Sequence, residues 1–225
     1  MDDERSAFLI ASENMDAELR TNETLNFLRD RVIQNLVELL ERPDFQTASQ
    51  ELLLETLVMI WGAFENLVSE TIRVLLNANP PLAAKLLGDE ATKKHFPSRG
   101  IPIEDLATHD FNLATSKGDL LLKDRHLDSL PIIKDVLRVV FKKEVALRDR
   151  LANRDLWLLW QRRHLIVHRR GVIDTVYLAR TSESAPIGSR LSVQSNYVEA
   201  SFVLIVDTAV ELLRAVTNCD ACTCS

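Results

Sequence analysis

The 225-residue sequence contains few of the residues that interrupt helices, because only six glycines and seven prolines occur in it. Aromatic residues make up 6% of the chain, which is too few for the pattern of a typical β-sandwich. Long stretches can therefore run as unbroken helices. The length suits one sizeable helical domain, and we expect that domain over residues 1–218.

Cysteine is absent from most of the chain and occurs only at Cys219, Cys222 and Cys224. A structural zinc site needs four ligands, and no fourth Cys or His lies beside these three. We expect residues 219–225 to form a disordered tail, with a CxxCxC metal clip as the alternative. The sequence otherwise predicts neither a metal nor a cofactor.

A long uncharged hydrophobic run is also missing. The most apolar stretch, residues 52–76, is interrupted by acidic and basic side chains, so we expect a core helix rather than a membrane span. The first ten residues, MDDERSAFLI, begin with acids, which argues against a secretory signal. We therefore expect a cytoplasmic protein without membrane contact.

Hydrophobic residues recur at helical spacing through most of the sequence. On the first segment the repeat is formed by Leu25, Leu28, Val32 and Leu36. On the last helix we expect an inward face formed by Phe202, Val206, Ala209/Val210, Leu213 and Val216. We expect one or two helices before Arg42 and a long helix over 48–77. One short helix is expected at 82–87 and one more within 103–122. Three further helices are expected at about 128–147, 153–169 and 197–218.

One stretch does not follow this pattern. Between residues 172 and 193, the segments VIDTVYL and RLSV favour β structure, and Pro186 and Gly188 lie between them. We therefore predict an all-α helical bundle with a short extended or β-hairpin insertion before the last helix.

The positive charge is concentrated in one region, although the net charge is −6. Residues 138–170 contain ten Lys or Arg and three Asp or Glu, whereas the rest of the chain contains 17 and 30. A basic region on an acidic protein can bind phosphate selectively. The alternative is a solvated helix face without a ligand.

This region includes most of the segment WQRRHLIVHRRGVIDTVY, residues 160–177. Arg163 is followed by the polar His164, three apolar residues and His168, close to the end of a predicted helix. The spacing resembles the R-x4-6-H motif of the HEPN superfamily, in which Asn, Asp or His occupies the place of His164. Arg170 stands where HEPN proteins paired with nucleotidyltransferases often carry Tyr, so control by adenylylation of that Tyr is not expected.

Three further segments are similar to the same superfamily. They are the residues after the motif, at Gly171, Ile173, Asp174 and Tyr177, a later pattern at Gly188, Leu191, Val193, Tyr197 and Val198, and the helix segment WGAFENLV at 61–68. The resemblance covers residues 61–213 in order, and its specific part is confined to 162–198. It implies a HEPN-type helical bundle.

The residue types of the motif suit the cleavage of RNA without a metal. The ribose 2′-OH can attack the neighbouring phosphate if a histidine such as His168 accepts its proton. An arginine such as Arg163 is permanently charged and holds phosphate oxygens in a planar fork. The expected products are a 2′,3′-cyclic phosphate and a 5′-OH.

The resemblance implies a metal-independent endoribonuclease for single-stranded RNA, tRNA or mRNA, acting as a toxin or antiphage effector with an antitoxin or sensor protein as partner. It also implies a homodimer. Five residues along a helix turn through about 140°, so Arg163 and His168 do not share a stripe, whereas two chains can bring two of each into one cleft. The alternative function is a non-catalytic HEPN module for RNA binding or protein assembly.

The two histidines have simpler alternatives. His168 could only cap the helix end, where a positive charge is favoured. His164 is expected to support the site by hydrogen bonding, although its i, i+4 spacing with His168 also suits a metal ligand pair.

The charged neighbours of the motif also have two interpretations each. Arg162, Arg169 and Arg170 are expected to contact RNA phosphates, or else they are ordinary surface charge. Glu65 could pair with Arg162 or Arg163 and orient it, or face water at the boundary of its helix.

Overall fold

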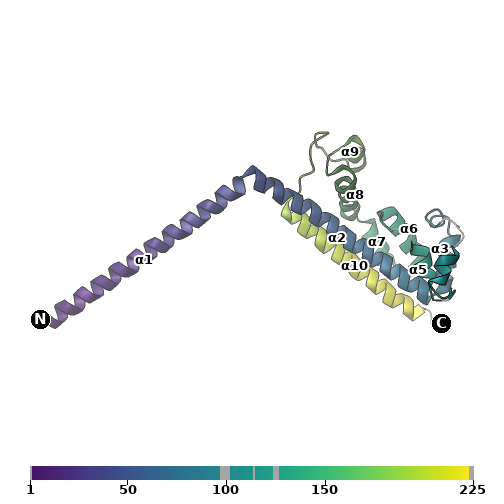
Figure 1. Cartoon of the computed structure of the whole chain (residues 1–225), viewed down its shortest axis with the longest axis horizontal. Coiled ribbons are helices and arrows are strands. Elements are labelled where there is room, and N and C mark those ends of the chain that lie inside the picture. The colour runs from purple at the N-terminus through teal and green to yellow at the C-terminus, as the bar shows by residue number, and fades with distance from the viewer. Residues whose placement is uncertain (1, 97–101, 114, 124–126, 223–225) are drawn as a thin grey trace. The chain divides into compact units, whose positions relative to one another are not determined.

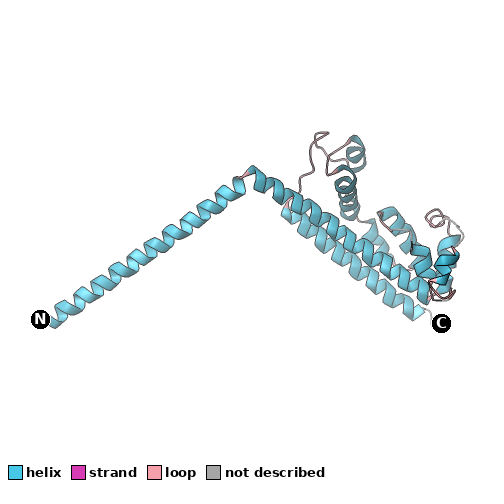
Figure 2. Cartoon of the chain, viewed as in Figure 1, coloured by secondary structure: helices cyan, strands magenta, loops and turns pink. Residues whose placement is uncertain are grey.

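The computed structural model of the chain describes residues 2–96, 102–113, 115–123 and 127–222, with side chains described within 21–219 (Figure 1). Figure 2 shows that helices dominate these ranges, and no β-strand occurs in them. The prediction of an all-α fold class is thereby confirmed. In chain order the helices are α1 (Asp2–Glu41), α2 (Pro43–Ala78), α3 (Pro80–Gly88), α4 (Ile103–Ala107), α5 (Lys117–Leu122), α6 (Leu130–Val140), α7 (Val145–Ala152), α8 (Arg154–Arg169), α9 (Thr175–Thr181) and α10 (Ser195–Cys222).

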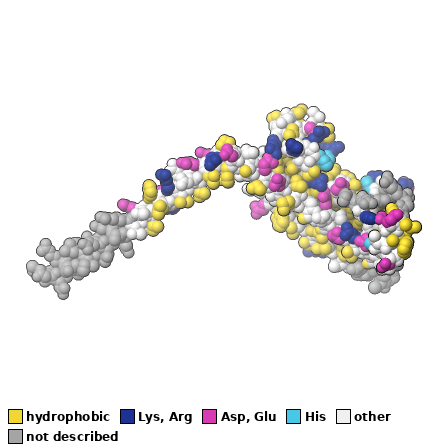
Figure 3. Space-filling view, in the orientation of Figure 1, with side chains coloured by type: hydrophobic (Ala, Val, Ile, Leu, Met, Phe, Trp, Pro, Cys, Tyr) yellow, Lys and Arg dark blue, Asp and Glu magenta, His cyan; other side chains and the backbone are white. Residues whose placement is uncertain are grey.

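The chain divides into two compact units, Met1–Glu51 and Leu52–Ser225, where the sequence predicted one domain over residues 1–218. The first unit consists of α1 and the beginning of α2. The hydrophobic repeat at Leu25, Leu28, Val32 and Leu36 lies on α1 as predicted, but each of these side chains is more than half exposed. Figure 3 shows hydrophobic side chains along the described part of this helix. Over residues 21–51, whose side chains are described, no residue is buried, so this stretch is held by helical hydrogen bonds rather than by a core.

The second unit contains a continuous hydrophobic core to which most of its helices contribute. Its central element is the part of α2 that follows Glu51, where Leu57, Trp61, Phe64, Val68 and Ile72 are at most 1% exposed. Their spacing of three and four residues places them on one face of the helix. The helix expected over 48–77 thus buries one apolar face in this core.

Length and composition alone would also allow α2 to cross a membrane, because an 18-residue window has a mean hydropathy of 1.4. One third of that window is buried inside the protein, and core helices satisfy the same criterion. The absence of membrane contact therefore stays a prediction from the sequence.

The described part of α10 buries a different face from the one predicted. Of the predicted residues Phe202, Val206, Val210 and Leu213 are exposed, and Val216 packs partly buried against the core. The buried face is formed by Ser201, Ile205, Thr208, Leu212 and Ala215. The two hydroxyl groups on this face donate to helix carbonyls, Ser201 to Tyr197 and Thr208 to Leu204, each at 2.7 Å. Because their polar groups are satisfied within the helix and their side chains are small, they can pack closely against neighbouring helices. Hydrophobic periodicity alone therefore selected the wrong face.

Other boundaries also differ from the predictions. The segment 103–122 holds two short helices, α4 and α5, rather than one. The helix predicted over 128–147 ends at Val140, because the buried Phe141 leaves helical geometry and the chain turns before α7 begins. At the C-terminus, α10 continues to Cys222, and the partly buried Cys219 packs against the core, so the predicted disordered tail does not begin at 219. Cys224 lies outside the described residues.

The segment 172–193 also differs from the predicted hairpin. Val172 and Arg190 form one isolated antiparallel bridge, and residues 175–181 form helix α9. Asp174 caps this helix, since its carboxylate accepts a hydrogen bond from the Tyr177 backbone N–H at 2.7 Å. Tyr177 and Thr181 are then buried on one face of α9. Capping and burial together outweigh the β preference of the VIDTVYL sequence.

A close contact between α5 and α2 provides a test of this fold. A Cβ atom on Gly118 would overlap the carbonyl oxygen of Arg73 in α2. The Gly118 backbone N–H donates to the Asn77 side chain at 2.7 Å, which fixes the approach. We expect Gly118→Ala to lower the free energy of unfolding by about 1–3 kcal/mol, because the backbone must move to relieve the overlap.

The change in stability can be measured by urea denaturation followed by circular dichroism. Gly62→Ala is the matched control, because a Cβ at Gly62 in α2 would meet no atom within 4 Å. Alanine at this helical position is expected to stabilise the protein by up to about 1 kcal/mol. Equal stabilities of the two variants would contradict the packing of α5 on α2.

Candidate functional site

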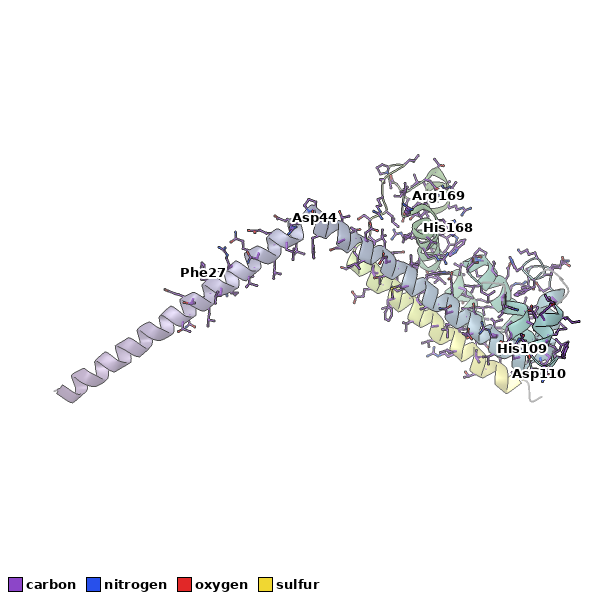
Figure 4. All side chains as sticks on the ribbon, in the orientation of Figure 1. Phe27, Asp44, His109, Asp110, His168 and Arg169 are labelled. Atoms are coloured by element: carbon purple, nitrogen blue, oxygen red, sulfur yellow. The ribbon has the colours of Figure 1, made fainter. Side chains whose placement is uncertain are left out.

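The candidate residues lie on α8, whose ends are defined by local interactions. Asn153 caps the first turn by accepting a hydrogen bond from the Asp155 backbone N–H at 2.6 Å. At the other end Arg170 and Gly171 both have positive φ, 53° and 74°, and the Gly171 N–H donates to the Leu165 carbonyl. His168 and Arg169 therefore occupy the last turn, where Figure 4 labels them near α9.

His164 and His168 lie one turn apart and face the same side of α8. Their ring centroids are 4.5 Å apart, and both side chains are exposed. Partial burial of the ring lowers the pKa of His164, although the residue as a whole is exposed. The nearby charges of His168, Arg180 and Arg163 lower this pKa further. His164 is therefore neutral at neutral pH and can form hydrogen bonds without adding charge. Among the described residues no group of three His, Cys, Asp or Glu could hold a metal ion.

Arg163 is held by a carboxylate from α2. Its Nη2 lies 3.3 Å from Glu65 Oε2, and the Trp61 indole N–H donates to the other oxygen, Oε1, of the same carboxylate. The Arg163 and Glu65 side chains are only 17% and 15% exposed. Glu65 thus pairs with Arg163, the first of the two alternatives, rather than facing water. A partly buried carboxylate that also accepts a tryptophan N–H restricts the positions available to the arginine.

Arg162 points away from the exposed histidines into a second polar network. Its Nη2 lies 2.7 Å from Glu183 Oε1, and the Tyr177 hydroxyl donates to Glu183 Oε2 at 2.5 Å. The guanidinium also stacks on the Tyr197 ring, 4.0 Å from its centroid. Burial, reinforced by the Glu183 charge, raises the pKa of Tyr177, so its hydroxyl stays protonated and donates. Arg162 thereby joins α8 to α9 and α10, and its contact with an RNA phosphate stays a prediction.

The network around Arg162 predicts a stability effect. We expect Glu183→Gln to lower the free energy of unfolding by about 1–3 kcal/mol, because a mostly buried guanidinium would lose its charged partner. Urea denaturation measures the effect. The control is Glu199→Gln on α10, since Glu199 is exposed and makes no ion pair with a described residue. Unchanged stability of Glu183→Gln would mean that Arg162 is not held by this pair.

Three arginines remain at the surface beside the histidines. Arg169 is 67% exposed, with its Nε 3.6 Å from Asp174 Oδ2, and Arg170 is exposed at the helix end. The third is Arg180 on α9, which the sequence did not single out. Its position follows from the helical form of 175–181, which the β-favouring residues concealed. Figure 3 shows His among Lys and Arg side chains in this part of the second unit.

The three tryptophans pack in or against the hydrophobic core. Trp61 is fully buried, and Trp157 and Trp160 pack partly buried against the core. Arg154 covers Trp157 at 4.3 Å from the ring centroid.

Comparison with protein-family models, with curated proteins and with solved structures finds no match to this chain.

Proposed function

We propose that the chain is a HEPN-type, metal-independent endoribonuclease in which His168 transfers protons and Arg163 binds the scissile phosphate. The observation that carries the proposal is the pair of neighbouring, exposed imidazoles of His164 and His168 near the end of a basic helix, directly after an arginine that Glu65 holds in place. The resemblance of residues 162–198 to the HEPN motif supports the same assignment. RNA is the substrate class because its 2′-OH supplies the nucleophile.

The chemistry requires a base and an acid. The 2′-oxygen forms a bond to phosphorus while its proton passes to a neutral imidazole, and the bond from phosphorus to the 5′-oxygen breaks as that oxygen receives a proton from an imidazolium. Arg163 would stabilise the negative charge on the phosphorane. His164, neutral at neutral pH, would orient His168 or the 2′-OH by hydrogen bonding. The products are a 2′,3′-cyclic phosphate and a 5′-OH.

A homodimer would supply both proton-transfer groups. In each chain His168 is exposed while Arg163 is largely covered, and His164 is assigned an orienting role, so one copy offers only His168 for two proton transfers. If two α8 helices face each other across a two-fold axis, the partner subunit's His168 can act as the acid. Light scattering on the purified protein tests the dimer directly, and a monomer that cuts RNA would exclude the composite site.

A second function is favoured by a specific observation. The outward face of α10 carries an exposed apolar row, formed by Phe202, Val206, Val210 and Leu213. Exposed apolar surface of this kind suits protein association, so a non-catalytic module for RNA binding or assembly is the alternative. The proposed context of a toxin or antiphage effector, with an antitoxin or sensor partner, derives from the HEPN resemblance.

An experiment that removes the 2′-OH from the RNA distinguishes the ribonuclease from the non-catalytic module. A pool of tRNA and mRNA would be incubated with the purified protein, and the preferred cut site would then be placed in a short oligonucleotide with and without a 2′-OH at that site. We expect both oligonucleotides to bind and only the ribose form to be cut. Binding of RNA from the pool without any cleavage would favour the assembly module.

A further inference from the structure

A small pocket lies between α8 and α9, beside the two histidines. Its volume is about 130 Å³, and its polar lining consists of Gln161, His164, Arg169, Asp174, Tyr177 and Arg180. That space is large enough to hold a phosphate group.

The pocket has more positive charge than its own acid can neutralise. Asp174 is the single acid in the lining. One of its oxygens caps α9 by accepting from the Tyr177 N–H at 2.7 Å, and the other lies 3.6 Å from Arg169 Nε. Arg180 makes no ion pair with a described residue. One arginine charge therefore faces the pocket without an anion.

A buried polar side chain also lines the pocket. Gln161 is 3% exposed. Its amide group can donate a hydrogen bond to a ligand there, so the pocket provides a donor as well as charge. The lowered pKa of His164, caused first by burial and then by His168, Arg180 and Arg163, agrees with a positive field in this place.

We propose that this pocket binds a phosphate group, held by Arg180 and Arg169 with the Gln161 amide at its buried end. His164 lines the pocket, and its ring centroid lies 4.5 Å from that of His168, so the bound phosphate lies directly beside the proposed cleavage centre. The assignment of this group as an RNA backbone phosphate next to the scissile one rests on the proposed function. The pocket would then position the strand on α8 and α9 through its backbone, without reading bases.

The test compares Arg180→Gln with wild type, using two probes. Inorganic phosphate is titrated while the ring signals of His164 are followed by NMR, and an RNA oligonucleotide with a 2′-deoxy cut site is titrated by fluorescence anisotropy at several salt concentrations. Arg148→Gln is the matched control, because Arg148 on α7 is exposed, makes no ion pair with a described residue and loses the same charge.

In wild type and Arg148→Gln we expect phosphate to raise the pKa of His164, because a bound anion stabilises the imidazolium. Arg180→Gln is expected to lose this effect. Its affinity for the RNA should fall about three- to ten-fold. The slope of log affinity against log salt concentration should become shallower by about one, because one counterion fewer is released on binding. Where RNA is cut, Arg180→Gln should raise KM more than it lowers kcat.

Several results would overturn parts of the inference. Equal phosphate binding by Arg180→Gln and Arg148→Gln would overturn the pocket. Arg180→Gln could instead lose phosphate binding while its affinity for RNA stays at the wild-type value. That result would assign the pocket to a free phosphate and overturn the RNA assignment. Arg180-dependent binding of both probes in a protein that cuts no RNA would support the pocket and overturn the proposed function alone.

Discussion

Replacing His168 with alanine is expected to lower the rate of RNA cleavage by about 10²- to 10⁴-fold, the usual loss when a general acid or base is removed. The side chain is exposed in the last turn of α8, and its ring contacts His164. We therefore expect the free energy of unfolding to change by less than about 0.5 kcal/mol. Single-turnover cleavage of a labelled RNA, with urea denaturation of the same samples, measures both quantities.

The matched control is His109→Ala. His109 follows α4, and Figure 4 labels it well away from His168 within the second unit. This variant removes an imidazole of the same kind, and we expect it to cut RNA at the wild-type rate. Equal rates for His168→Ala and wild type would exclude His168 as a proton-transfer group.

The second large effect is expected at Arg163. Arg163→Ala should lower the cleavage rate by about 10²- to 10³-fold, the loss typical of removing one preorganised donor to a developing negative charge. It should also lower the free energy of unfolding by about 1–3 kcal/mol, because Glu65 would lose its partner in a mostly buried place. Activity and stability must therefore be measured on the same preparation below the onset of unfolding.

Glu65→Gln separates the catalytic role of Arg163 from its structural role. Both variants break the ion pair between α8 and α2, but only Arg163→Ala removes the group that would touch the phosphate. We expect Glu65→Gln to lose less than about ten-fold in cleavage rate at a similar cost in stability. Equal losses of cleavage in the two variants would mean that Arg163 acts only through the fold.

Sequence patterns predicted α8 and its end closely, because the signals there are local. The helix was expected over 153–169 and runs from Arg154 to Arg169. Asn153 before it and Gly171 after it are ordinary capping residues, and their effect depends little on distant contacts. The juxtaposition of His164 and His168 also followed from their i, i+4 spacing alone.

The features that sequence analysis missed depend on contacts between distant segments. Arg162 and Arg163 are neighbours in the sequence, and only Glu183 and Glu65, on other elements, decide which guanidinium is drawn into which network. Arg180 was missed because residues 172–178 favour strands locally, whereas a cap at Asp174 and the burial of Tyr177 produce a helix. On α10, periodicity could not distinguish the apolar face that remains exposed from the mixed face that packs inside.

The most direct test of the central claim is the chemistry of the RNA ends left by the purified protein in EDTA. A labelled RNA would be incubated with wild-type protein and His168→Ala, and the fragment ends identified by phosphatase and kinase treatment. A metal-independent enzyme that uses His168 predicts fragments with 2′,3′-cyclic phosphate and 5′-OH ends from wild type alone. Cleavage that stops in EDTA, or that leaves 5′-phosphate ends, would contradict the account.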